Sequence, residues 1–145
     1  MAYPVNEALH QLIHAYKRRL RTATQAQKID LPVNHLRVLK GVCKCPQSTA
    51  RTISQRMNQD KAQVTRVLNE LTQSGLIEKA ENPNDRRSQF LIPTVAGQRT
   101  LEKVNALESE VAGEMTHNLS DQELKVFTHI ANVMIQNLAE DSAKD

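Results

Sequence analysis

Apolar residues recur every three or four positions along most of this chain, the spacing that places them on one face of an α-helix. The first such stretch runs from Val5 to Leu20, and we expect Leu31 and Pro32 to end that helix. A second, more compact stretch runs from Val33 to Val42, and Pro46 stops it. The pattern predicts a long leading helix followed by a shorter, more apolar one.

Two short helical stretches separated by a tight turn come next. The hydroxyls of Ser48 and Thr49 can cap the first, and Asp60 with Gln63 forms a start that resembles a capping box for the second. The second stretch has apolar residues at strict helical spacing, namely Val64, Val67, Leu68 and Leu71. Gly75 can then adopt the left-handed conformation that ends a helix.

The period then changes to that of strands. Residues 76–80 and 88–92 are short β-prone runs joined by a charged, turn-forming link, which predicts a hairpin with a basic tip. Pro93 lacks a backbone donor, so we expect the second strand to stop early. Thr94 can cap a long helix, and a full capping box at residues 120–123 opens a last one. Two short helices followed by a hairpin predict a winged helix-turn-helix, and the fold class is mainly α (α+β).

Composition excludes several classes of protein. The 145 residues contain 3% aromatic side chains and no Trp, so stacking of single-stranded bases on aromatic faces is disfavoured. The whole chain has only four glycines, which disfavours a Gly-rich phosphate-binding loop. No apolar run reaches the ~18 residues of a membrane span. The start also lacks the order of a secretory signal, so we expect a cytoplasmic protein without membrane contact.

Charge is distributed unevenly. Residues 32–94 carry ten Lys and Arg against five Asp and Glu, net +5, whereas residues 95–145 carry four against nine, net −5. A basic middle segment indicates an anionic partner.

The helix expected over residues 61–74 has a polar face that suits the major groove of DNA. Opposite its apolar stripe or at its flanks lie Lys61, Ala62, Gln63, Thr65, Arg66 and Asn69. Arg66 is the main candidate for reading a base, because arginine makes bidentate contacts with guanine. The alternative is a solvated arginine paired with Glu70 one helical turn later.

The hairpin tip, residues 81–88, places Asp85 beside Arg86 and Arg87. The carboxylate could orient an arginine toward a narrow minor groove, where the negative potential is enhanced. The alternative is a charged turn that keeps the hairpin soluble.

These residues carry a resemblance to a known family. The runs from Ala50 to Ser54, from Lys61 to Leu71 and from Gly75 to Ile77, with the wing from Asn82 to Arg87, resemble the MarR family of bacterial transcriptional regulators. Leu91 to Thr94 and Gly97 strengthen the match, although Pro93 stands where the family usually has Leu. The Asp-Arg-Arg wing is similar to that of the SlyA-like members.

The resemblance implies a homodimer on a pseudo-palindromic double-stranded operator. It divides the chain into an N-terminal dimerisation helix (1–31), a winged helix-turn-helix DNA-binding domain (32–94) and C-terminal dimerisation helices (95–145). It implies a minor-groove contact for Arg87, with Arg86 as a candidate phosphate contact. We expect a repressor that covers a promoter, with activation by displacement of another repressor as the alternative. The resemblance implies relief by a small effector, such as a phenolic or lipophilic anion. Candidate lining residues for that effector are Leu9, Ile13, Tyr16, Leu36 and Lys40.

Other chemistries have weaker support. Cys43 and Cys45 could sense oxidants, but intracellular thiols are usually structural. His10 and His14 have the spacing of two metal ligands without a visible third. No residue pattern indicates catalysis or a cofactor, so we expect no enzyme and no metal site. A helical adaptor without DNA binding is the remaining alternative.

Overall fold

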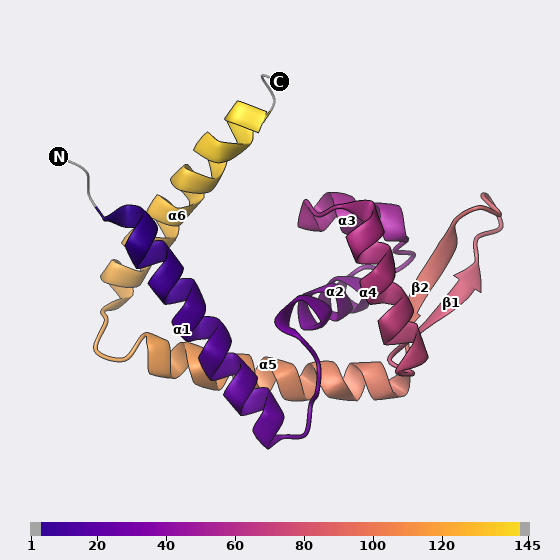
Figure 1. The fold of residues 1–145 in the computed structure, drawn as a ribbon, viewed down its shortest axis with the longest axis horizontal. Helices are drawn as coiled ribbons and strands as arrows, with labels where there is room; N and C mark the ends of the chain where they lie inside the picture. Colours follow the sequence, from indigo (N-terminus) through magenta and orange to yellow (C-terminus); the bar gives the residue numbers. More distant parts are fainter. Residues whose placement is uncertain (1–3, 143–145) are drawn as a thin grey trace. The chain divides into compact units, whose positions relative to one another are not determined.

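The computed structural model describes residues 4–142, which form six helices and one hairpin (Figure 1). The elements in chain order are α1 (Val5–Ala26), α2 (Val33–Lys44), α3 (Ala50–Met57), α4 (Lys61–Gln73), β1 (Ile77–Glu81), β2 (Gln89–Pro93), α5 (Val95–Met115) and α6 (Asp121–Ser142). This arrangement confirms the mainly helical winged helix-turn-helix. The chain divides into two compact units at Val111, and each is described by itself.

The first unit contains two hydrophobic clusters. One holds the helix-turn-helix together, since the predicted stripe of α4 packs with residues of α2, Ile53, Ile77 and Leu91. The other joins the end of α1 to α2 and α5 through Leu20, Leu36 and Val104, which are 0–2% exposed. Because α2 contributes to both clusters, it connects the winged part to the long helices of this unit.

The leading helix ends earlier than we expected. Helix α1 stops at Ala26 because Lys28 adopts a left-handed conformation with φ of 59°. The backbone N–H of Ile29 then donates to the carbonyl of Thr24 at 2.9 Å, and Ile29 is buried in the second cluster. This is a Schellman-type end, so Leu31 and Pro32 lie beyond the helix and do not terminate it.

The prediction that Pro93 shortens the wing was wrong. Strand β2 includes Pro93, which lies opposite Ile77, and both strands begin and end one residue later than predicted. Thr94 N–H donates to Leu76, whereas Leu91 N–H points away from β1 and donates to Ser48. By the alternation of an antiparallel pair, the nitrogen of Pro93 also faces away from β1, so the ladder loses no hydrogen bond.

Helix α5 begins at a tight junction with the end of α4. The Thr94 hydroxyl donates to the carbonyl of Gly75 at 2.6 Å and accepts from Gly97 N–H at 3.0 Å, which confirms Thr94 as a cap. Gly75 has the expected left-handed conformation, with φ of 76°.

The second unit consists of the end of α5 and helix α6. The predicted capping box opens α6, because Ser120 and Glu123 exchange hydrogen bonds between side chain and backbone. Within residues 4–142, every helix is too short or too polar to cross a membrane.

Candidate nucleic-acid interface

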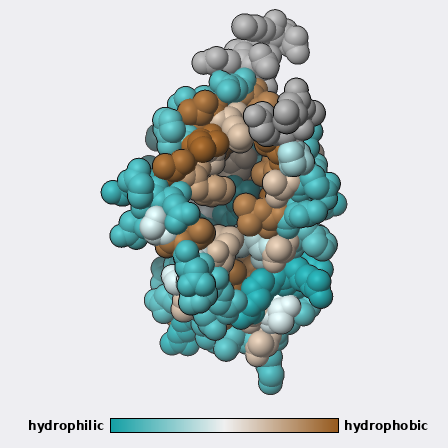
Figure 2. Space-filling view, turned by 90° about the vertical axis from the view of Figure 1, so that its left-hand side faces the viewer, coloured by the Kyte–Doolittle hydropathy of each residue, from teal (hydrophilic) through white to brown (hydrophobic). Residues whose placement is uncertain are grey.

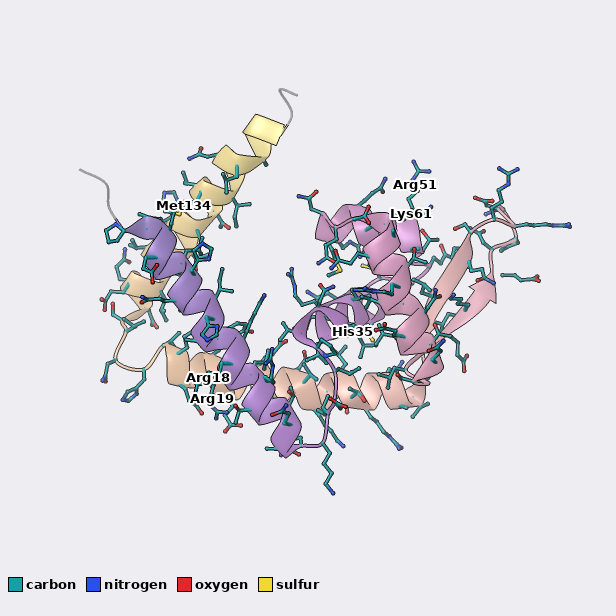
Figure 3. The ribbon with its side chains drawn as sticks, viewed as in Figure 1. Arg18, Arg19, His35, Arg51, Lys61 and Met134 are labelled. Atoms are coloured by element: carbon teal, nitrogen blue, oxygen red, sulfur yellow. The ribbon has the colours of Figure 1, made fainter. Side chains whose placement is uncertain are left out.

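The interface begins at the N-termini of α3 and α4. Thr49 and Thr52 form a reciprocal capping box at the start of α3, and the Asp60 carboxylate accepts from the backbone N–H of Gln63 at the start of α4. These caps fix where each helix starts. Arg51 and Lys61 project from the two helix starts at the same end of the helix-turn-helix (Figure 3).

A cleft runs between these helix starts, the exposed face of α4 and the wing. Its lining residues are Thr49, Ala50, Arg51, Lys61, Thr65, Leu68, Asn69, Lys79, Asp85, Arg87, Ser88, Gln89 and Leu91. Four of these side chains are cationic and only Asp85 is anionic. The cleft therefore presents net positive charge.

The predicted residues fall into two groups around this cleft. Lys61, Thr65, Asn69, Asp85 and Arg87 line it. The remaining four, Ala62, Gln63, Arg66 and Arg86, are exposed outside that lining. Arg86 instead lines a separate cleft with residues of the wing, including Glu81 and Asn82.

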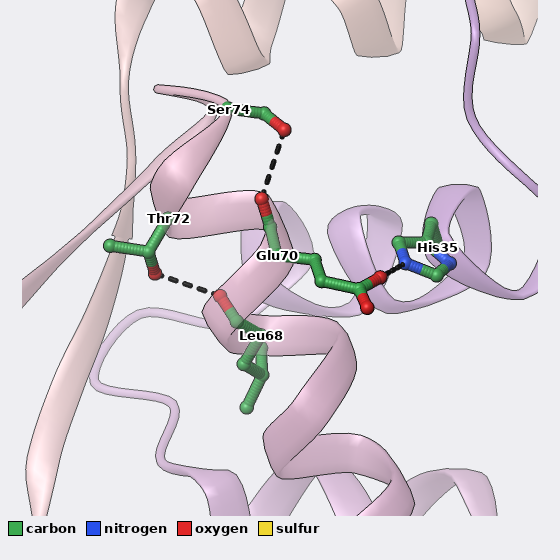
Figure 4. Close-up of polar contacts among 5 residues, drawn as sticks. All are labelled: His35, Leu68, Glu70, Thr72 and Ser74. Atoms are coloured by element: carbon green, nitrogen blue, oxygen red, sulfur yellow. Dashed lines mark hydrogen bonds and ion pairs between the residues drawn. The ribbon is translucent and has the colours of Figure 1, made fainter.

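Glu70 is engaged by a partner other than Arg66. Its carboxylate contacts Nε2 of His35, which joins α4 to α2 (Figure 4). The His35 side chain is 13% exposed and that of Glu70 is 51% exposed. This contact disfavours the alternative in which Glu70 holds the guanidinium of Arg66.

The hairpin tip is ordered by its own side chains. The Asp85 carboxylate accepts from the backbone N–H of Arg87 at 3.0 Å, and the Asn82 side chain accepts from the N–H of Asn84 at 3.0 Å. Asp85 thus shapes the backbone of the turn, and its effect on the orientation of an arginine side chain stays a prediction. Such Asx turns fix the path of the chain at a tip.

Eight lining residues were not predicted as site residues, and five of these have polar side chains, namely Thr49, Arg51, Lys79, Ser88 and Gln89. Strand alternation could have found Lys79, because it lies on the same face of β1 as the buried Ile77. Arg51 could have been found from its place in the first turn of α3, beside the capping threonine. The others depend on how the hairpin folds back, which no local pattern indicates.

Comparison with known proteins shows a similarity to one family. Residues 29–88, which include α2, α3, α4 and most of the wing, match the MarR family. The winged helix-turn-helix of this chain is therefore similar to that of the MarR family. The chain is 26% identical over 129 residues to the HTH-type transcriptional regulator YwhA of Bacillus subtilis, covering 86% of this chain and 93% of YwhA. It is 36% identical over 73 residues to the regulator BilQ of Clostridioides difficile, covering 50% of this chain and 49% of BilQ.

Solved MarR structures share the fold of this chain. A mutant MarR from E. coli complexed with operator DNA aligns with a TM-score of 0.82 at 22% identity, covering 90% of this chain and 93% of that one. A MarR protein from Peptoclostridium difficile aligns with a TM-score of 0.86 at 20% identity, covering 97% and 91%. The family and these relatives are transcriptional regulators rather than enzymes. The SlyA-like subtype stays a prediction.

The candidate effector residues occupy different environments. Leu9 and Ile13 are 52% and 41% exposed on α1, while Leu36 is buried in the second cluster with Tyr16 packed against it. Lys40 pairs with Glu108 of α5. Only part of the set therefore lies together, and its ligand role stays a prediction.

The cysteines and histidines that the structure describes do not form a cluster of metal ligands. Cys43 and Cys45 are free, burial raises the pKa of the Cys43 thiol, and Arg56 donates to Sγ of Cys45. His10 and His14 are exposed on α1. Among the residues that the structure describes, no three His, Cys, Asp or Glu side chains gather as a metal site would require.

Proposed function

We propose that this chain is a homodimeric, sequence-specific regulator that represses transcription by covering a promoter. Helix α4 enters the major groove and the wing enters the neighbouring minor groove. The observation that carries this proposal is the cleft whose lining includes Arg51, Lys61, Lys79 and Arg87. Duplex DNA supplies the phosphates that such a surface attracts, and binding must then weaken steeply with salt.

Five of the predicted side chains of α4 have a role in this proposal. Arg66 reads a base, because it is exposed on α4 and Glu70 already has His35 as a partner. Thr65, Ala62 and Gln63 face the groove beside it. Lys61 contacts a phosphate near the start of α4, and Arg51 does the same from α3.

The wing supplies the second contact. Arg87 inserts into the minor groove, and Asp85 supports it by fixing the backbone of the tip. Arg86, which lines a second cleft along the wing, contacts a phosphate.

Exposed apolar side chains support the homodimer. Along α6 the exposed residues Phe127, Ile130, Met134 and Leu138 follow steps of three and four and are 43–72% exposed. Helix α1 exposes Val5, Leu9, Leu12 and Ile13, and Figure 2 shows hydrophobic side chains reaching the surface. An exposed apolar stripe on a helix marks an interface, and a twofold dimer matches a pseudo-palindromic operator.

Sedimentation velocity tests the dimer. Ile130→Asp should give a monomer with weak operator binding, because a charge would be buried in the interface. Val95→Asp is the matched control, since Val95 is 65% exposed on α5 and lies outside the α6 stripe. A dimer in both variants would contradict this interface.

A small anion would relieve repression in this proposal. Lys40 would exchange Glu108 for the charge of the effector, while Tyr16 and Leu36 would pack against its apolar part. Phenolic carboxylates should raise the melting temperature of the wild type more than that of Lys40→Met, and thermal melting curves measure this difference. Equal shifts in the two proteins would remove Lys40 from the site.

Selection of bound sequences from random duplex DNA tests the DNA-binding role. A pseudo-palindromic sequence should be enriched, and Arg87→Ala should bind it more weakly than the wild type. Arg99→Ala removes the same charge from an exposed position of α5 outside the cleft and should bind like the wild type. Failure to enrich any sequence, or equal loss in both variants, would contradict the proposal.

A further inference from the structure

A hydrogen bond connects the wing to the predicted recognition helix. Nζ of Lys79 on β1 donates to Oδ1 of Asn69 on α4 over 2.6 Å. Both side chains line the cationic cleft, and both residues are exposed to solvent. Their polar atoms are therefore accessible to a molecule that occupies the cleft.

The chemistry of lysine fixes which way the Asn69 amide faces. An ammonium group can only donate, so it meets the carbonyl oxygen of the amide and not the NH₂ group. The NH₂ group of Asn69 keeps two donors for another partner, and Lys79 keeps those of its three donors that Asn69 does not use. The pair offers adjacent donors, while the acceptor of Asn69 already faces a cation.

This arrangement does not suit the usual partner of asparagine. Asparagine reads adenine by donating to N7 and accepting from the N6 amino group. Here Oδ1 of Asn69, which would accept from N6 of adenine, already accepts from Lys79. The ammonium group of Lys79 would also lie close to the N6 amino group of the adenine. Guanine instead presents two neighbouring acceptors, N7 and O6, on its major-groove edge. Two adjacent donors match that edge.

We propose that Asn69 and Lys79 together read a guanine, and that Lys79 is a specificity-determining residue. This inference rests on the proposed function and deepens it by naming a base. The surroundings agree, because Lys61 and Arg87 line the same cleft and add further donors. One oxygen of Asp85 is already occupied by the backbone N–H of Arg87.

The test compares base preferences of variants at the selected operator. One position should favour guanine over adenine by about 10-fold or more in the wild type, as expected of a bidentate contact. Lys79→Met keeps the aliphatic stem and should reduce that preference below about threefold, with no change of preference elsewhere. Asn69→Ala should affect the same base pair, and the double variant should lose little more, because the two residues act as one unit.

Lys61→Met is the matched control, since Lys61 lines the same cleft as a candidate phosphate contact. It should weaken binding to every sequence alike and leave the base preferences unchanged. Replacing the guanine by 7-deazaguanine, which lacks the N7 acceptor, should weaken the wild type but not the double variant.

Three results would overturn the inference. Lys79→Met could keep every base preference and lose affinity evenly, which would make Lys79 a phosphate contact. Asn69→Ala could instead lose preference for an adenine. If the wild type selects no sequence at all, the proposed function itself fails. The first two results, in contrast, would leave the proposed function intact and reject only the reading of a guanine.

Discussion

Gly97 offers the sharpest test of the packing around the wing. A Cβ atom at this position would overlap the carbonyl oxygen of Leu76 and would lie 3.0 Å from its carbonyl carbon, whereas carbon atoms normally approach to about 3.5–4.0 Å. The same carbonyl accepts from Thr94 at 3.1 Å, so it cannot move away without losing the junction that starts α5. Gly97→Ala should therefore destabilise the protein by about 1–3 kcal/mol, the cost of overpacking.

Gly113 in the same helix provides the opposite case. A Cβ atom there meets no heavy atom within 4 Å, so Gly113→Ala should stabilise the protein by up to about 1 kcal/mol through helix propensity. Urea unfolding of both variants and the wild type at one protein concentration measures the two changes. Equal stability of Gly97→Ala and the wild type would refute the close approach of α5 to Leu76.

Thr49→Ala removes the oxygen that caps α3 and should cost about 1 kcal/mol in urea unfolding; no change would show that the cap is dispensable. Lys40→Met should cost less than about 1 kcal/mol, because the Lys40 and Glu108 side chains remain 32% and 24% exposed, and the difference should shrink in high salt. Hydrogen bonds with the backbone and side chain of Ser120 lower the pKa of Glu123 from its ordinary 4.5. The stabilisation from this carboxylate is thus present above pH 4.5 and is lost as the pH falls through the lowered pKa. The melting curves of the wild type and Glu123→Gln should therefore converge in acid. Because burial raises the pKa of Cys43, iodoacetamide should label this thiol more slowly than a cysteine in a short peptide at mildly alkaline pH, and mass spectrometry of the labelled protein checks the rate.

Local patterns predicted most of the fold. The stripe of α4 and the caps at Thr49, Thr94 and Ser120 were confirmed, because each depends on residues close together in the sequence. The end of α1 was missed because a lysine, rather than a glycine, adopts the left-handed conformation there. The effect of Pro93 was misjudged because the side of β2 that faces β1 follows from the pairing register.

The candidate site was predicted only where one element supplies it. The exposed face of α4 follows from helical periodicity, and Lys61, Thr65 and Asn69 indeed line the cleft. Helical periodicity could not predict contacts between side chains of different elements. The partner of Glu70 is His35, 35 residues away, and that of Asn69 is Lys79 on the wing.

Salt-dependent titration of the selected operator and of a random duplex tests the central claim most directly. For the wild type, the logarithm of the association constant should fall steeply and linearly with the logarithm of the salt concentration. The wild type should also bind the operator more tightly than the random duplex. Arg66→Ala should lose about 1–3 kcal/mol on the operator and little on the random duplex, as expected of a base contact. Binding without salt dependence, or without preference for the operator, would contradict a sequence-specific regulator that acts through α4 and the wing.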